Sequence, residues 1–204
     1  YQLGLGGILA DDMGLGKTVT TLAFLEHLRV QNKMGQVLIV VPTSLTYNWV
    51  SETQRFTPGI PIHIFQSKFQ DQALDFMRDN PNCILLTTYG LLQEQAAFFD
   101  QVSWQVQVFD EAQNLKNISA KRTTAARQLR ARFKVCLTGT PLENHLGEFY
   151  SLVDLVVPEA LGSLSEFREK YVSPEVLNLE EIRFLRLKTK PLVLRRTKSE
   201  ILSE

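Results

Sequence analysis

Short, nearly continuous runs of apolar residues recur along the first two thirds of the chain and predict β-strands. The longer segments between them have apolar residues at helical spacing. Strands without polar alternation are buried on both faces, and strands that alternate with helices form a parallel sheet with helices on both faces. The pattern therefore predicts an open α/β fold. The expected strands are Ile8–Ala10, Val37–Val41, Ile62–Phe65, Ile84–Leu86, Val106–Phe109 and Val135–Leu137, and the expected helices are Val19–Arg29, Leu45–Phe56, Phe69–Arg78 and Thr123–Leu129.

The pattern changes after Pro141, where helical spacing dominates. Ser163 and Glu166 have the spacing of a capping box at the start of one of these helices. We therefore predict a helical appendage after the sheet domain. Its expected helices are Glu148–Val157, Ser165–Tyr171 and about Leu179–Lys188.

Charge is balanced overall and uneven locally. The 204 residues include 22 lysines and arginines and 22 aspartates and glutamates, so no global charge draws the chain to nucleic acid. Residues 121–134 contain six basic residues and no acid, and residues 183–198 contain seven and no acid. Solvated helix faces often have this composition, so the two runs alone do not indicate a partner.

The positions of the cysteines and the hydropathy of the chain indicate in which cellular compartment the protein is expected. Cys83 and Cys136 lie in or beside apolar strand runs, which favours buried free thiols in a reducing compartment. No apolar run approaches the roughly 20 residues of a membrane span, and no signal-peptide pattern is present. We expect a soluble, intracellular protein with no membrane partner.

The segment Asp11–Thr18 follows the first apolar run and precedes the first helical pattern. Gly14 and Gly16 allow a tight turn whose N–H groups point inward at phosphate oxygens, and the following helix adds its partial positive charge. In such a loop Lys17 would reach the β- and γ-phosphates, and Thr18 would hold Mg²⁺. Asp11 stands where the strict phosphate-loop pattern has its first glycine, so an ordinary glycine-rich turn remains an alternative.

Two adjacent carboxylates, Asp110 and Glu111, come directly after an apolar strand run. Such a pair is costly at the tip of a buried strand unless a cation meets it. The pattern predicts that Asp110 binds Mg²⁺, directly or through water, and that Glu111 orients or deprotonates the attacking water. The alternative is an acidic helix cap. Gln107 makes this strand less apolar than the others and leaves its place in the sheet open.

Hydroxyl side chains follow three other strand runs. Ligands of open α/β sheets bind at the carboxyl ends of the strands, so these hydroxyls are placed to meet phosphate oxygens or the carboxylate loop. Serine and threonine are also ordinary helix caps, and Gly139 with Pro141 also fits a plain turn. The hydroxyl residues are Thr43, Ser44, Thr87, Thr88, Thr138 and Thr140.

The order of these motifs resembles the SWI/SNF-type helicase-related ATPases of superfamily two, whose motor is a pair of RecA-like lobes. The resemblance covers nearly the whole chain, and Asp110-Glu111-Ala112-Gln113-Asn114 looks most like bacterial and archaeal members. Asp12, Gln113 and His145 depart from residues more usual in the family. The motifs are Asp11-Asp12-Met13-Gly14-Leu15-Gly16-Lys17-Thr18, Val41-Pro42-Thr43-Ser44-Leu45 with Asn48-Trp49, Thr87-Thr88-Tyr89, Asp110 to Asn117, Leu137 to Asn144, Glu148 to Leu152 and Leu194-Arg195-Arg196-Thr197-Lys198.

The resemblance implies a domain layout and a set of site residues. Residues 1–146 would form the first RecA-like ATP-binding lobe, with the P-loop NTPase fold. Residues 147–204 would form the helical appendage and the start of a linker to a second lobe outside this chain. The ATP-binding residues would be Asp12, Met13, Gly14, Leu15, Gly16, Lys17 and Thr18, with Mg²⁺ on Thr18 and Asp110, and with Lys17, Asp110, Glu111 and Gln113 as the catalytic set.

The resemblance also implies how the nucleotide site meets nucleic acid. Gln113, Thr138 and Thr140 would couple it to DNA. Thr43, Ser44, Thr87 and Thr88 would contact the phosphate backbone, and such contacts carry no sequence information. DNA binding would then be nonspecific and would weaken with salt.

The function implied is an ATP-driven motor that tracks along duplex DNA. In this family the second lobe supplies an arginine finger, which is worth about 10³–10⁵ in rate. We therefore expect the chain alone to bind nucleotide weakly and hydrolyse it negligibly. Its compartment would be the cytoplasm, with the nucleoid, in a prokaryote and the nucleus in a eukaryote.

Two other functions fit some of the same residues. The first is a lobe of a superfamily-two RNA helicase, and the second is a nucleotide-binding scaffold without turnover. The loop from Met13 to Thr18 and the helical appendage favour a DNA translocase over an RNA helicase. Arg195, Arg196 and the other residues of the second basic run are candidates for contacts to DNA or to the second lobe.

Overall fold

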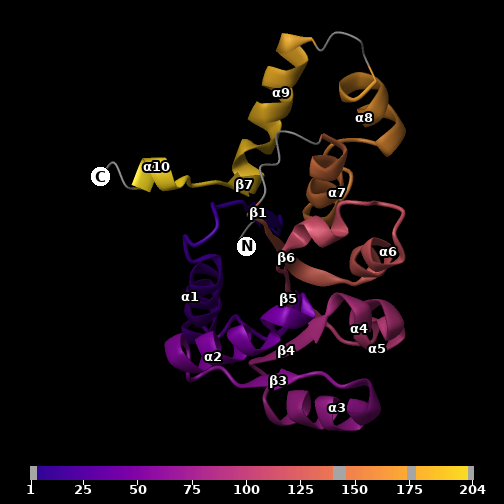
Figure 1. The fold of residues 1–204 in the computed structure, drawn as a ribbon. Helices are drawn as coiled ribbons and strands as arrows, with labels where there is room; N and C mark the ends of the chain where they lie inside the picture. Colours follow the sequence, from indigo (N-terminus) through magenta and orange to yellow (C-terminus); the bar gives the residue numbers. More distant parts are fainter. Residues whose placement is uncertain (1–3, 140–145, 174–177, 202–204) are drawn as a thin grey trace.

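The computed structural model describes residues 4–139, 146–173 and 178–201, and its core is one parallel sheet of seven strands (Figure 1). The strand order is β3-β4-β2-β5-β6-β1-β7, and every neighbouring pair is parallel. Their carboxyl ends therefore lie at one edge, where the candidate motifs follow. The strands are β1 (Gly7–Leu9), β2 (Gln36–Val41), β3 (Ile62–Ile64), β4 (Cys83–Thr88), β5 (Trp104–Phe109), β6 (Ala131–Leu137) and β7 (Val193–Leu194).

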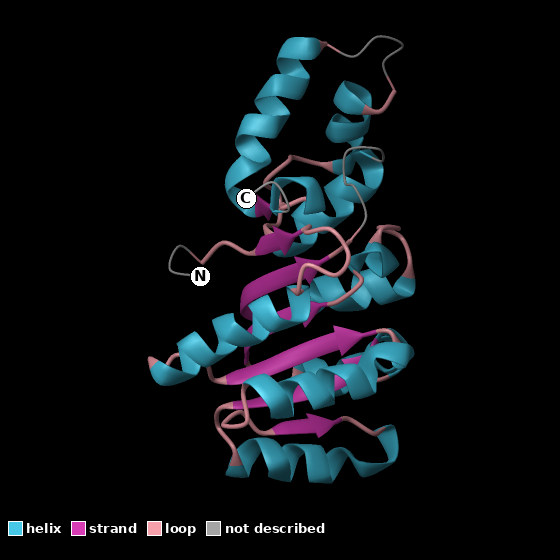
Figure 2. Cartoon of the chain, turned by 60° about the vertical axis from the view of Figure 1, so that its left-hand side comes forward, coloured by secondary structure: helices cyan, strands magenta, loops and turns pink. Residues whose placement is uncertain are grey.

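Helices cover both faces of this sheet, as the apolar pattern predicts (Figure 2). Alternate residues of β2 show the division, because Val37 and Ile39 pack with α1 and α2, whereas Leu38 and Val40 pack with α3 to α7. The α/β prediction is therefore confirmed. The helices are α1 (Lys17–Val30), α2 (Thr46–Phe56), α3 (Gln70–Asp79), α4 (Tyr89–Glu94), α5 (Ala96–Asp100), α6 (Lys121–Gln128), α7 (Leu146–Val156), α8 (Leu164–Tyr171), α9 (Leu179–Thr189) and α10 (Lys198–Ile201).

Strand β5 lies between β2 and β6 despite its glutamine. Gln107 is fully buried, and its side-chain amide donates to the Arg130 carbonyl oxygen at 3.2 Å. The amide nitrogen of this central glutamine is therefore satisfied by a backbone acceptor, whereas its Oε1 is buried with no hydrogen-bond partner among the described residues.

The appendage is partly continuous with the sheet. Helix α7 packs against β1 and β6, and its Leu152 and Val153 are buried in the same cluster as sheet residues. Helices α8 and α9 extend beyond the β7 edge (Figures 1 and 2). The predicted capping box is present at α8, where Ser163 Oγ accepts from the Glu166 N–H and the Glu166 side chain accepts from the Ser163 N–H.

Several short elements were not predicted, among them α10. The chain returns to the sheet as β7, which pairs with β1 at Ile8 and Leu9. Helices α4 and α5 are too short to display a clear apolar period. Cys83 and Cys136 are buried free thiols, as expected, and burial raises the pKa of each to about 12.

Candidate functional site

The predicted phosphate loop connects β1 to α1. Gly14 and Gly16 adopt left-handed backbone angles, with φ of 85° and 77°. Among the described residues no side chain caps the start of α1, and the first turn of this helix holds no acid. The first N–H groups of a helix have no partner inside it, so this end of α1 suits an anion. Lys17 Nζ donates to the Asp11 carbonyl oxygen at 2.9 Å, which leaves two of its three donors for a ligand.

Asp110 lies at the end of β5 and is 6% exposed. Its carboxylate accepts from the Trp49 indole N–H at 2.8 Å and from the Glu111 N–H at 2.8 Å. Burial raises the pKa of Asp110, and these two hydrogen bonds and the charge of Lys17 oppose that rise. The Tyr89 hydroxyl donates to the Asp110 carbonyl oxygen at 2.6 Å, so the residue is held at both backbone and side chain.

A chain of hydrogen bonds joins the carboxylate loop to the end of β6. The Gln113 amide donates to Glu111 Oε2 at 2.6 Å, and the Thr138 hydroxyl donates to Gln113 Oε1 at 3.2 Å. Glu111 has a φ of 48°, which is unusual for a residue other than glycine. Three predicted residues therefore form one connected unit.

Gly139 brings the β6 loop against the phosphate loop. A Cβ on Gly139 would lie 2.9 Å from Met13 Cγ and 3.4 Å from Lys17 Nζ. Only a residue without a side chain fits this approach unless its neighbours shift. The loops after β1 and β6 thus meet at Lys17, and the loop after β5 joins them through the Thr138–Gln113 hydrogen bond and the charge interaction of Asp110 with Lys17.

The residues predicted to meet DNA differ in exposure. Thr43 and Ser44 are exposed in a short 3-10 helix, Thr43–Leu45, which follows β2. Thr88 caps α4, with its hydroxyl accepting from the Leu91 N–H at 3.3 Å. Thr87 is 1% exposed, and its hydroxyl has no hydrogen-bond partner among the described residues, so it offers no surface for direct contact. Thr140 and His145 lie outside the described residues.

Sequence reasoning missed the partner of Asp11. This carboxylate is fully buried and accepts from the Arg196 N–H at 2.9 Å and Nε at 3.0 Å, and also from the outer guanidinium nitrogen. The pair raises the pKa of Arg196. Arg196 was a candidate for DNA or lobe contact, whereas here its guanidinium binds the phosphate-loop segment. The sequence did contain one indication of such a partner, because Asp11 is an acid at a position where the phosphate-loop pattern has a glycine.

Trp49 and Tyr89 were also missed as supports of Asp110. Both belong to motifs quoted for the resemblance, and both carry one polar atom on a large apolar ring. Their partner lies 61 and 21 residues away along the chain. Sequence spacing alone could not identify that pairing.

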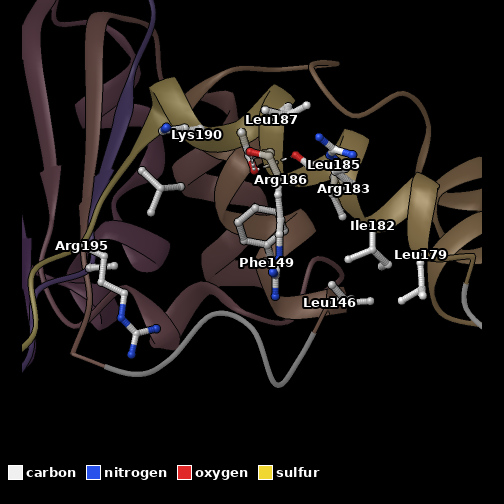
Figure 3. A pocket seen from close by; sticks show the side chains of 13 residues that line it. Leu146, Phe149, Leu179, Ile182, Arg183, Leu185, Arg186, Leu187, Lys190 and Arg195 are labelled. Atoms are coloured by element: carbon white, nitrogen blue, oxygen red, sulfur yellow. Dashed lines mark hydrogen bonds between the residues drawn. The ribbon is translucent and has the colours of Figure 1, made fainter.

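A separate apolar cavity of about 620 Å³ lies between α7, α9 and β7 (Figure 3). Leu146, Phe149, Ile182 and Leu185 point into it, and the residues of its lining that the structure describes include arginines and no carboxylate. Its described lining shares no residue with the phosphate loop 11–18 and does not include Asp110, so it is distinct from the site around Lys17.

The residues around Lys17 fit a magnesium nucleotide. The glycine turn leaves backbone donors open, Lys17 adds charge, and Asp110 supplies a supported carboxylate for Mg²⁺. Thr18 lies in the first turn of α1, beside Lys17. No cluster of three histidine, cysteine or acidic side chains suitable for a metal occurs in residues 4–139, 146–173 and 178–201. Carboxylate, hydroxyl and phosphate oxygens are ligands that Mg²⁺ accepts.

Comparison with known proteins decides the family, because all of residues 1–204 match the SNF2-related domain. The chain belongs to the SNF2-related domain family. A solved SWI2/SNF2 ATPase core from Sulfolobus solfataricus in complex with dsDNA superposes with a TM-score of 0.87 and 36% identity, over 97% of this chain and 41% of that one. The RecA-like fold implied by the resemblance is therefore confirmed.

Bacterial and eukaryotic proteins match nearly the whole of this chain. The putative ATP-dependent helicase/translocase YwqA of Bacillus subtilis is 36% identical over 203 residues, or 98% of this chain and 22% of that protein. The chromatin-remodeling ATPase INO80 of Eremothecium gossypii is 32% identical over 223 residues, or 100% of this chain and 16% of that protein. The chain thus spans less than a quarter of these relatives. Within the described residues, no helix is long and apolar enough to cross a membrane.

Proposed function

We propose that this chain is the ATP-binding lobe of a DNA-dependent ATPase that translocates on duplex DNA. The observation that carries the proposal is the meeting of three strand-end loops around Lys17, because it joins a phosphate cradle, an acidic pair and a relay in one site. Family membership and relatives named as ATP-dependent helicases support ATP as the nucleotide.

Each residue has a defined part in this proposal. The loop from Asp12 to Gly16 and the first turn of α1 hold the phosphates, and Lys17 neutralises them. Thr18 and Asp110 hold Mg²⁺, which when bound neutralises charge on the transferred phosphoryl group. Glu111 accepts a proton from the attacking water or orients it. Trp49 and the Glu111 N–H keep the Asp110 carboxylate in place.

Contact with DNA is assigned to the same edge of the sheet. Thr43 and Ser44 are exposed there, and Thr88 lies at the end of β4. The dsDNA-bound structural relative supports duplex DNA as the partner. Gln113 and Thr138 form the coupling unit, because a shift of the β6 loop would move the partner of Glu111. A second RecA-like lobe of the same polypeptide completes the site in this proposal.

ATP hydrolysis by the full-length protein tests this function. We expect Mg²⁺-dependent phosphate release to rise at least about tenfold with duplex DNA, and to vanish with EDTA or in Lys17→Ala. The assay compares duplex DNA, single-stranded DNA and RNA. Stimulation by RNA alone would identify an RNA helicase, and no turnover with any polymer would identify a nucleotide-binding scaffold.

Replacing Thr138 by valine tests the coupling unit. Valine keeps the volume of threonine and removes the donor to Gln113 Oε1, which is then left without that bond. We expect the DNA-stimulated rate to fall about tenfold, the equivalent of one buried hydrogen bond, and the DNA-free rate to fall far less. Thr124→Val, an exposed site on α6, is the matched control. Equal losses with and without DNA would contradict the coupling role.

Under this proposal the cellular compartment depends on whether the chain comes from a prokaryote or a eukaryote. A motor on duplex DNA would act at the nucleoid in the cytoplasm of a prokaryote and in the nucleus of a eukaryote. The relatives come from both kinds of organism.

A further inference from the structure

The segment 194–198 runs beside the phosphate loop, although it is nearly the whole chain away in sequence. The Ala10 N–H donates to the Leu194 carbonyl oxygen at 2.8 Å, and the Asp12 N–H donates to the Arg196 carbonyl oxygen at 3.1 Å. The pairing of β1 with β7 therefore continues past the end of β1 and into the loop.

Two carboxylates of the loop fix this segment further. The buried Asp11 accepts from the backbone and guanidinium of Arg196, and Asp12 accepts from the Lys198 N–H at 3.1 Å. A capping arrangement then sets the direction of the chain, because Glu200 accepts from the Thr197 N–H at 2.8 Å. The position of Lys198 is thus determined from both sides.

The side chain of Lys198 reaches the glycine turn. A Cβ on Gly14 would lie 4.0 Å from both Cε and Nζ of Lys198. Lys198 is exposed, and the end of its side chain lies within contact distance of the space that a side chain on Gly14 would fill. The ammonium group is therefore close to the loop whose N–H groups would face phosphate. A lysine is a compact charge with three donors, which suits phosphate oxygens.

We infer that Lys198 is a second cationic contact for the phosphates of the bound nucleotide, held in place by the Arg196–Asp11 pair. Lys17 and Lys198 would then approach the phosphates from α1 and from the end of the chain respectively. This inference rests on the proposed ATP site. It makes nucleotide binding depend on the segment 194–198, so occupation of the site and the position of that segment are linked.

Nucleotide binding by the full-length protein tests the inference without requiring turnover. Lys198→Met removes the charge and keeps most of the side-chain length. We expect its Kd for fluorescent ATP to rise about 2- to 5-fold, the size of one solvent-exposed charge contact, with AMP binding unchanged. Lys198→Arg should restore most of the ATP affinity. Lys68→Met is the control, because Lys68 is an exposed lysine beside the β3 edge of the sheet.

The outcomes separate this inference from the function on which it rests. A wild-type protein that binds no nucleotide overturns both. A wild-type protein that binds ATP, with an unchanged ratio of ATP to AMP affinity in Lys198→Met, overturns the inference alone. An equal loss of ATP affinity in Lys68→Met would also overturn it, because the loss would then follow from the change in net charge of the protein. A loss for ATP alone that shrinks in high salt supports a direct ionic contact.

Discussion

Replacing Glu111 by glutamine should lower ATP turnover at least about 100-fold while nucleotide binding stays within about twofold of wild type. Glutamine has the same shape and still accepts the hydrogen bond from Gln113 through its amide oxygen. It cannot accept a proton from water at neutral pH. The measurement is phosphate release by the full-length protein with saturating duplex DNA, beside a nucleotide titration.

The matched control is Glu94→Gln, which makes the same change at an exposed glutamate at the end of α4. It should leave turnover unchanged. A Glu111→Gln variant that keeps a third or more of the wild-type rate would exclude Glu111 as the catalytic base. A variant that loses nucleotide affinity and rate together would instead indicate that Glu111 maintains the loop, through its left-handed backbone and its bond to Gln113.

Local patterns predicted most of the fold. Each expected strand is present because a continuous apolar run is what burial on both faces requires. The α8 capping box was found because its two residues lie three positions apart. Strand β7 was missed, since two residues carry no periodicity and it is held in the sheet through pairing with β1.

The sequence indicated the residues of the candidate site. It did not indicate the residues that hold them in position. Lys17, Asp110 and Gln113 lie in the segments that follow β1 and β5, whose carboxyl ends the parallel topology brings to one edge. Trp49 and Arg196 act on that edge through bonds that span 61 and 185 residues. Such contacts depend on how helices and loops pack, and neither spacing nor propensity encodes them.

The buried carboxylate of Asp11 explains why the phosphate loop tolerates an acid where a glycine is usual. A buried charge without a partner is costly, and Arg196 compensates this one with a backbone donor and side-chain donors. The loop therefore depends on the end of the described chain for its stability. A substitution of Arg196 should therefore disturb the phosphate loop and the position of Lys17.

Replacing Arg196 by alanine should accordingly destabilise this lobe by about 2–4 kcal/mol. A fully buried pair that loses one partner costs about 3–5 kcal/mol, and the value here is reduced because the Arg196 side chain is 40% exposed and water can reach the gap. The Arg196 N–H also remains on Asp11 in the variant. The measurement is denaturant unfolding of the full-length protein, following the transition that contains this lobe.

A double-mutant cycle separates the ion pair from general damage. Asp11→Asn with Arg196→Ala should be more stable than Arg196→Ala alone, because it removes the uncompensated charge. Arg195→Ala is the neighbouring control, since the Arg195 side chain lines the apolar cavity beside α9 rather than meeting Asp11 (Figure 3). A smaller effect for Arg196→Ala than for Arg195→Ala would show that the pair does not hold the loop. Strict additivity of the two changes would lead to the same conclusion.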